Sequence, residues 1–188
     1  MILIRHGQSE FNVVYGVTRQ DPGIIDPGLT ELGRQQVAAT ARTLAGRGAH
    51  TLVASPYRRA IQTALIVGEA LNLSVTIDPL IGERAAFTCD IGTPVSELAA
   101  LWPELDFAHL PEMWWPDIEE SEEALDLRGR SFRDRMRDNR EWNGVVIVTH
   151  WGFIRTLTGH KVGNGTAVRF DPHSGHPGGG TVESIPDV

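Results

Sequence analysis

The chain has 188 residues, of which 41% are hydrophobic and 22% charged, so one globular domain spanning 1–188 with a substantial core is expected. Its 17 lysines and arginines against 24 aspartates and glutamates give a net charge of -7, which argues against broad nucleic-acid binding but not against a small anionic substrate. Cys89 is the only cysteine, which excludes an intrachain disulfide and a cysteine-rich metal site.

The sequence shows no targeting or membrane-spanning segment. No apolar run approaches the roughly 18 residues that suggest a spanning helix. Met1 leads directly into a predicted strand, without the basic leader and apolar core of a signal peptide. We therefore expect a cytoplasmic protein that binds neither a membrane nor nucleic acid.

Short runs rich in β-branched residues alternate with helical or irregular material along the chain. These runs lie at 2–5, 51–54, 73–77 and 145–149. Such alternation is typical of an α/β fold in which helical crossovers connect the strands of a mostly parallel sheet.

Two crossover helices are predicted, one at 30–45 and one starting at Ser55. The first begins with Thr30 as N-cap, and the second has Ser55 as cap and Pro56 in its first turn. The residues expected on their buried faces are Val37, Ala41, Leu44 and Ala45 in the first helix and Ile61, Ala64, Leu65 and Leu71 in the second.

The regular pattern lapses after the third strand, and we expect an aromatic-rich insertion at about 84–120 over the site, with a short helix near 94–101. Its tryptophans either form a lid that sets specificity or bury area in the core; they are Trp102, Trp114 and Trp115. A charged surface helix is predicted after Ser121. The glycine- and proline-rich tail at 171–188 is expected to be partly disordered and flexible.

Segments that lie far apart in the sequence each supply a group suited to phosphoryl chemistry. Arg5 and His6 follow the first predicted strand, and Arg59 lies in the first turns of the helix after the second. Glu83 follows an apolar pair and a glycine, and His150 closes the strand GVVIVTH. Because the carboxyl ends of parallel strands converge on one crevice, these side chains are expected to meet at one edge of the sheet.

Phosphoryl transfer explains why these residue types belong together. A neutral imidazole such as that of His6 can attack phosphorus to give a phosphohistidine, which divides hydrolysis into two easier steps. Guanidinium groups hold the nonbridging oxygens, and a carboxyl such as Glu83 protonates the leaving oxygen and later activates water. Gly7 is expected to permit a tight turn and a close approach of the backbone to phosphate.

Each of these residues alone is weak evidence, because strand-end histidines are often structural and arginines near helix starts are often surface charges. A metal site formed by His6, Glu83 and His150 is the rival interpretation. The adjacent Arg5 would repel a divalent cation, and the sequence has no close ligand pair such as H-x-x-x-H. We expect neither a metal ion nor another cofactor.

Ordered motifs cover about 1–170 of the chain. They are RHG, which holds Arg5 and His6; RHGQSEFN, which holds Asn12; DPGLTELGRQQ; SPYRRAIQTA, which holds Arg59; and VTHWG, which holds His150. Glu83 lies between the last two motifs. Together they resemble the histidine phosphatase superfamily, the phosphoglycerate mutase-like group. The resemblance implies a three-layer α/β/α sandwich and catalysis without a metal.

The resemblance also implies a role for each matching residue. His6 resembles the phosphorylated nucleophile and Glu83 the proton donor, while the remaining phosphate pocket is formed by Arg5, Arg59 and His150. Three further candidates for binding substrate or phosphate are Ser9, Asn12 and Trp151. A turn-stabilising role for the first two and core packing for the tryptophan stay open as alternatives.

The expected function is a metal-independent phosphatase that hydrolyses a small phosphorylated metabolite through a phosphohistidine on His6. One alternative is phosphotransfer of the phosphoglycerate mutase type, and another is a catalytically silent domain that binds a phosphorylated ligand. Mutases of the cofactor-dependent type generally have longer chains, which favours the phosphatase. The motifs specify neither the substrate nor the oligomeric state.

Overall fold

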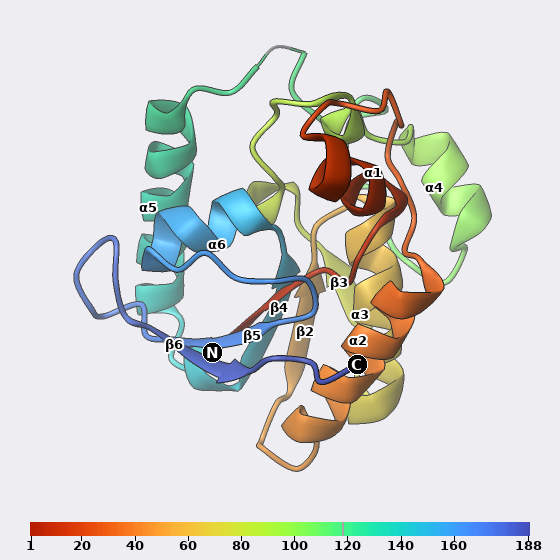
Figure 1. Cartoon of the computed structure of the whole chain (residues 1–188). Coiled ribbons are helices and arrows are strands. Elements are labelled where there is room, and N and C mark those ends of the chain that lie inside the picture. Colours follow the sequence, from red (N-terminus) through yellow and green to blue (C-terminus); the bar gives the residue numbers. More distant parts are fainter. Residues whose placement is uncertain (118) are drawn as a thin grey trace.

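The computed structural model describes residues 1–117 and 119–188, which fold into a six-stranded sheet between two layers of helices (Figure 1). The strands are β1 (Ile2–Arg5), β2 (Thr51–Ala54), β3 (Val75–Ile77), β4 (Val145–Thr149), β5 (Ala167–Phe170) and β6 (Gly180–Ser184). Their order across the sheet is β3-β2-β4-β1-β5-β6. The first four strands pair in parallel, and β5 and β6 add antiparallel pairs at one side. The predicted α/β class with a mostly parallel sheet is confirmed.

Six α-helices surround this sheet in the described part of the chain. They are α1 (Glu10–Thr18), α2 (Glu31–Leu44), α3 (Arg58–Leu71), α4 (Val95–Leu101), α5 (Glu122–Asp138) and α6 (Trp151–Thr158). Short 3-10 helices lie at Pro79–Ile81, Thr88–Asp90 and Trp142–Gly144. None of the described helices is long and apolar enough to cross a membrane. Helices α1 and α6 were not predicted, because each is short and begins inside a motif segment, at Glu10 in RHGQSEFN and at Trp151 in VTHWG.

Helix α2 begins as its sequence predicts. The hydroxyl oxygen of Thr30 accepts a hydrogen bond from the Gly33 backbone N–H at 3.0 Å, which satisfies one of the free donors of the first turn. The buried face contains Val37, Ala41 and Leu44, but Ala45 is exposed, because it follows the last helical residue and turns away from the sheet.

Helix α3 begins later than predicted, at Arg58 rather than in the turn that contains Ser55 and Pro56. Ser55 does not cap it. The capping oxygen comes instead from Asp26, whose Oδ1 accepts from the Arg58 backbone N–H at 3.0 Å. A cap supplied from another segment leaves no signature in the local sequence, and it frees the Ser55 hydroxyl for another contact.

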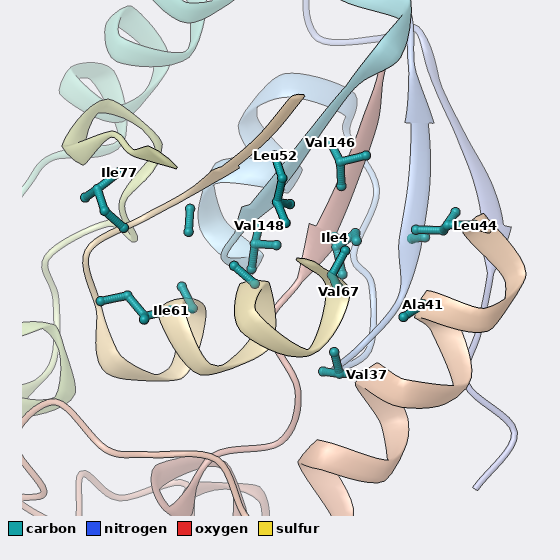
Figure 2. Packing of buried hydrophobic residues seen from close by; sticks show 14 of the residues in the cluster. Ile4, Val37, Ala41, Leu44, Leu52, Ile61, Val67, Ile77, Val146 and Val148 are labelled. Carbon is teal, nitrogen blue, oxygen red and sulfur yellow. The ribbon is translucent and has the colours of Figure 1, made fainter. Parts of the chain in front are cut away.

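Both faces of the sheet are apolar, and each is covered by two helices. Figure 2 shows side chains of α2 and α3 packed against those of β1, β2 and β4, including Val37, Ile61, Leu52 and Val148. On the opposite face, Phe132 of α5 and Phe153 of α6 pack with each other and with residues of the same strands. Every residue of β4 is buried, as expected for a central parallel strand covered on both faces.

The tail is more regular than predicted. Residues 180–184 form β6, so the expectation of disorder does not hold for that part of the tail. The loop that leads to β6 is held by Arg133, a buried α5 side chain whose guanidinium donates to the carbonyl oxygens of Leu157, Ser174 and Gly178 at 2.6, 2.9 and 2.9 Å. Three widely separated segments are therefore joined by one side chain.

Two tryptophans of the segment 84–120, Trp102 and Trp114, pack into the protein. The Trp114 indole N–H donates to the Thr93 carbonyl at 2.9 Å, and its ring meets the Tyr57 ring edge-on at 4.7 Å. Trp102 also packs against the core on the α2 and α3 side of the sheet. Of the two readings, core packing describes these side chains, while the short helix predicted near 94–101 is present as α4.

Gly7 and Gly33 permit the close approach of two backbone segments. A Cβ on Gly7 would overlap the Gly33 carbonyl oxygen, and a Cβ on Gly33 would overlap the Gln8 carbonyl oxygen. Gly7 does not adopt a positive φ, and its N–H donates to the Thr63 hydroxyl at 3.1 Å. The glycine is therefore needed for packing against α2, and its approach to phosphate stays a prediction.

Gly33→Ala is expected to lower the free energy of unfolding by about 2–3 kcal/mol, because backbone atoms would have to move to admit the methyl group. Urea unfolding measures the loss. The matched control is Gly16→Ala in α1, where an added Cβ meets no described atom, and a gain of about 0.5–1 kcal/mol is expected. Equal stability of the two variants would contradict the packing argument.

Candidate active site

A cavity of about 490 Å³ lies at the carboxyl ends of the parallel strands. All but one of the predicted site residues line it: Arg5, His6, Ser9, Asn12, Arg59, Glu83 and Trp151. The exception is His150, which is fully buried, with its ring centroid 5.2 Å from that of His6. The parallel topology thus brings together residues from four distant segments.

His6 follows β1 and is only 3% exposed. Its Nδ1 lies 2.7 Å from the Gly7 carbonyl oxygen. Because a carbonyl can only accept, Nδ1 carries the proton and Nε2 retains its lone pair. Burial, reinforced by the charges of Arg59 and Arg5, holds the pKa of His6 well below its ordinary value. The ring is therefore a neutral imidazole with a defined tautomer.

Two arginines supply positive charge beside His6. The Arg5 guanidinium donates to the Val162 carbonyl at 2.7 Å, and burial lowers the pKa of Arg5 to about 10, so it remains charged at neutral pH. The Arg59 guanidinium donates to the Cys89 carbonyl at 2.8 Å and to Asp90 at 3.1 Å. Burial opposes the charge of Arg59, but Asp90 and other partners outweigh burial and raise its pKa.

His150 is positioned by a residue that the sequence did not indicate as part of the site. Its Nε2 lies 2.8 Å from the hydroxyl oxygen of Ser55, and its Nδ1 has no hydrogen-bond partner among the described residues. Burial, followed by the charge of Arg59, holds the pKa of His150 well below its ordinary value. A neutral imidazole whose Nδ1 carries the proton would accept from Ser55 and have one donor left for an oxyanion.

Glu83 is partly exposed and held by backbone N–H groups. Its Oε1 accepts from Gly152 and from Arg84, each at 2.9 Å. Burial raises the pKa of Glu83, and the negative charge of Asp90 raises it further. This carboxyl therefore holds its proton at higher pH than an ordinary glutamate, which suits a general acid.

Ser9 and Asn12 stabilise a turn and also line the cavity. They form a capping box at the start of α1, in which the Asn12 side-chain oxygen accepts from the Ser9 backbone N–H at 3.0 Å. The same oxygen accepts from Asn164 at 3.0 Å, a cavity residue with no motif signature in the sequence. The Asn12 oxygen is thus engaged in local bonds, and its NH₂ group is the end available to an anion.

The cavity lining also includes aromatic and basic side chains. Phe11, Tyr15 and Phe87 form one wall, with ring centroids 5.1 to 5.6 Å apart. On another side, the Arg155 guanidinium lies 5.0 Å from the Trp151 ring centroid. Aromatic residues therefore do line the cavity, but they come from α1, from Phe87 and from Trp151 of α6 rather than from the clustered tryptophans.

The donor set of the cavity suits an anion. Across residues 1–117 and 119–188, no three His, Cys, Asp or Glu side chains are grouped so that they could hold a metal ion. Arginine guanidiniums and imidazoles instead converge beside His6. Such groups hold tetrahedral oxyanions by charge-assisted hydrogen bonds.

Comparison with known proteins agrees with this geometry. The family model described as "Histidine phosphatase superfamily (branch 1)" matches residues 1–174. The chain belongs to this superfamily. It is 32% identical over 174 residues to a glucosyl-3-phosphoglycerate phosphatase of Mycobacterium tuberculosis, covering 84% of this chain and 73% of that one. It is also 32% identical over 161 residues to phosphoserine phosphatase 1 of Hydrogenobacter thermophilus, again covering 84% and 73%.

The fold of this superfamily member is shared with solved relatives. A mycobacterial glucosyl-3-phosphoglycerate phosphatase, solved in complex with VO3, superposes with a TM-score of 0.62 at 27% sequence identity. The match covers 89% of this chain and 88% of that one. The three-layer arrangement implied by the sequence motifs is thus confirmed.

Gly152→Ala is expected to displace the Glu83 carboxyl, because the new Cβ would overlap its Oε1. Glu83 is the predicted proton donor, and for such a group a misplacement of about 1 Å is expected to lower kcat roughly 10–100-fold for alkyl phosphates. Steady-state kinetics and the unfolding midpoint should be measured together. The control is Gly175→Ala, where an added Cβ meets no described atom. Wild-type kcat in Gly152→Ala would show that the Glu83 position does not limit turnover.

Proposed function

We propose that this protein is a metal-independent phosphatase that hydrolyses small phosphomonoesters through a phosphohistidine at Nε2 of His6. The observation that carries the proposal is the neutral His6 ring, whose tautomer leaves Nε2 unprotonated beside Arg5 and Arg59. The named phosphatase relatives support this class of substrate. Glucosyl-3-phosphoglycerate and phosphoserine, which their names mention, are the first compounds to try.

The first step transfers the phosphoryl group to the enzyme. Nε2 of His6 attacks phosphorus, the bond from phosphorus to the ester oxygen breaks, and Glu83 gives its proton to the leaving alcohol. Arg5 and Arg59 hold the nonbridging oxygens as charge spreads in the transition state, with His150 as a further donor. The low pKa of His6 keeps its lone pair available, and the raised pKa of Glu83 keeps its proton available.

The second step returns the enzyme to its starting state. Glu83, now a carboxylate, takes a proton from water as the water oxygen attacks phosphorus, and the bond between phosphorus and Nε2 breaks. Inorganic phosphate leaves, His6 is again neutral and Glu83 is again protonated. The same carboxyl thus serves as acid and then as base, so no external proton carrier is needed.

The remaining cavity residues are assigned to substrate binding. The amide NH₂ of Asn12 is suited to donate to the transferred phosphate, and Ser9 holds that amide in place. Trp151, backed by Arg155, is suited to contact the leaving group at the cavity mouth. A cavity of about 490 Å³ is large enough for a small metabolite beyond its phosphate.

Two other functions use the same pocket. A mutase would keep phospho-His6 long enough to return the phosphate to a reoriented substrate, whereas a silent binding domain would lack a working nucleophile or acid. The phosphatase names of the relatives favour hydrolysis over phosphotransfer. The presence of both His6 and Glu83 in the cavity favours catalysis over binding alone.

A phosphate-release screen in the presence of EDTA tests the proposal, using sugar phosphates, phosphoglycerates, nucleotides and phosphoamino acids. Wild type should release phosphate, and His6→Ala should lose at least about 10³-fold because no nucleophile remains. His173→Ala, an exposed histidine that does not line the cavity, is the control and should match wild type. Unchanged turnover in His6→Ala, or loss of activity with EDTA, would reject the proposed mechanism. Interconversion of 3- and 2-phosphoglycerate with a bisphosphoglycerate primer would indicate the mutase.

The pH dependence tests the role of Glu83. For alkyl phosphates, kcat/KM should fall as the pH rises through the raised pKa of Glu83, because the carboxylate has no proton to give. Glu83→Gln should remove this dependence and lower kcat/KM about 10²–10⁴-fold. For p-nitrophenyl phosphate, whose leaving group needs no proton, the loss of kcat/KM should be much smaller, because kcat/KM depends on the first step and not on the hydrolysis of phospho-His6. Equal losses of kcat/KM for the two substrate types would contradict the assignment of Glu83 as proton donor.

A further inference from the structure

Asp90 is a buried carboxylate for which neither the motifs nor the mechanism above assigns a role. It ends the 3-10 helix Thr88–Asp90, lines the cavity and is only 3% exposed. Its Oδ2 accepts from the backbone N–H groups of Ala86 and Phe87, each at 3.1 Å. Its Oδ1 accepts from the Arg59 guanidinium, also at 3.1 Å. A buried carboxylate is costly unless it is paired, and both oxygens of Asp90 have partners.

The contacts of Asp90 connect two parts of the catalytic machinery. On one side is Arg59, whose other Nη donates to the Cys89 carbonyl and whose guanidinium lies 4.5 Å from the Tyr57 ring centroid. On the other side is the turn of residues 84–90, which directly follows Glu83. One carboxylate therefore fixes the direction of the phosphate-binding arginine relative to the chain segment that carries the acid.

We propose that Asp90 is a positioning residue that aims Arg59 at the phosphate and keeps a negative charge beside Glu83. The assignment rests on the proposed function, because it acts through two residues of that mechanism. It explains why a site built to bind an anion contains a buried anion of its own. A guanidinium already held by Asp90 and the Cys89 carbonyl needs little reorganisation when phosphate binds.

Asp26 is the natural comparison, because it is a second buried carboxylate close to Arg59. Its Oδ1 lies 3.9 Å from an Arg59 Nη, but the same oxygen accepts from the Arg58 backbone N–H at 3.0 Å. Its Oδ2 accepts from the backbone and hydroxyl of Thr93 at 3.0 and 2.7 Å. Asp26 therefore secures the start of α3, whereas Asp90 binds the Arg59 side chain directly.

The charges that face Glu83 come from several elements. Arg5 on β1 and Arg59 on α3 favour its ionised form, as does the Arg84 backbone N–H, while Asp90 opposes ionisation. The adjacent imidazoles, His6 and His150, are neutral. Three further guanidiniums lie near this segment, and each has a carboxylate partner. Those of Arg84 and Arg155 pair with Glu122, and that of Arg128 pairs with Glu120 and also donates to the Glu83 backbone carbonyl at 3.2 Å. After burial, Asp90 is the group that most raises the pKa of Glu83.

Two equilibrium measurements on Asp90→Asn test the proposal. Binding of inorganic phosphate, measured by calorimetry, should weaken about tenfold, because Arg59 is no longer held in the direction of the phosphate. Removal of a negative charge alone would instead strengthen phosphate binding, so tighter binding would overturn the positioning role. The titration midpoint of Glu83, followed by carboxyl ¹³C NMR and assigned with Glu83→Gln, should fall by about one pH unit. Asp26→Asn is the matched control, and its Glu83 midpoint should equal that of wild type. The proposal would be overturned if Asp90→Asn kept both the wild-type Glu83 midpoint and the wild-type phosphate affinity. It would also be overturned if the Glu83 midpoint fell equally in Asp90→Asn and Asp26→Asn.

The wild-type enzyme provides a second test that does not depend on the folding of a variant. The Nε–H of Arg59 should be rigid on the nanosecond timescale by ¹⁵N relaxation before phosphate is added, and it should remain rigid afterwards. A mobile Arg59 in the phosphate-free enzyme would overturn the positioning role. Neither test requires turnover. Full activity in His6→Ala would therefore reject the phosphohistidine mechanism separately, while these measurements decide the role of Asp90.

Discussion

Arg59 carries a full positive charge at a position that is only 3% exposed, and much of the surrounding structure compensates for that burial. A buried cation needs hydrogen-bond acceptors and a counter-charge, which Cys89 and Asp90 supply from the turn after Glu83. The same cation, with burial, keeps His6 and His150 neutral. One charge thus makes the cavity positive, favours the neutral form of both imidazoles and ties α3 to the turn that follows Glu83.

The fold satisfies a second constraint, which is that residues from four segments must meet at one place. Parallel strands achieve this because their carboxyl ends lie on the same edge, so β1 and β4 deliver His6 and His150 side by side. The close contact of Gly7 with Gly33 brings the start of α2 against the loop after β1. Packing of the backbone explains these glycines.

Local sequence predicted what depends on local physics. The four parallel strands, the Thr30 cap of α2 and the helices α4 and α5 follow from periodicity and capping residues. Predictions failed where the partner of a residue lies in a distant part of the chain. Asp26 caps α3, the Ser55 hydroxyl bonds to His150, and β5 and β6 extend the sheet by antiparallel pairing. The strand β6 has little apolar pattern, and it exists because β5 offers a free edge.

By itself the sequence determined the chemical types available to the site, because Arg5, His6, Arg59, Glu83 and His150 each lie in a recognisable motif. It also determined the alternation of strands and helices, which is typical of a parallel sheet whose strand ends bring such residues to one edge. Only the tertiary structure decided the protonation of these groups and the direction in which they point. Both depend on burial and on partners such as Asp90, Ser55 and the Gly152 N–H, which lie close in space but distant or unmarked in the chain.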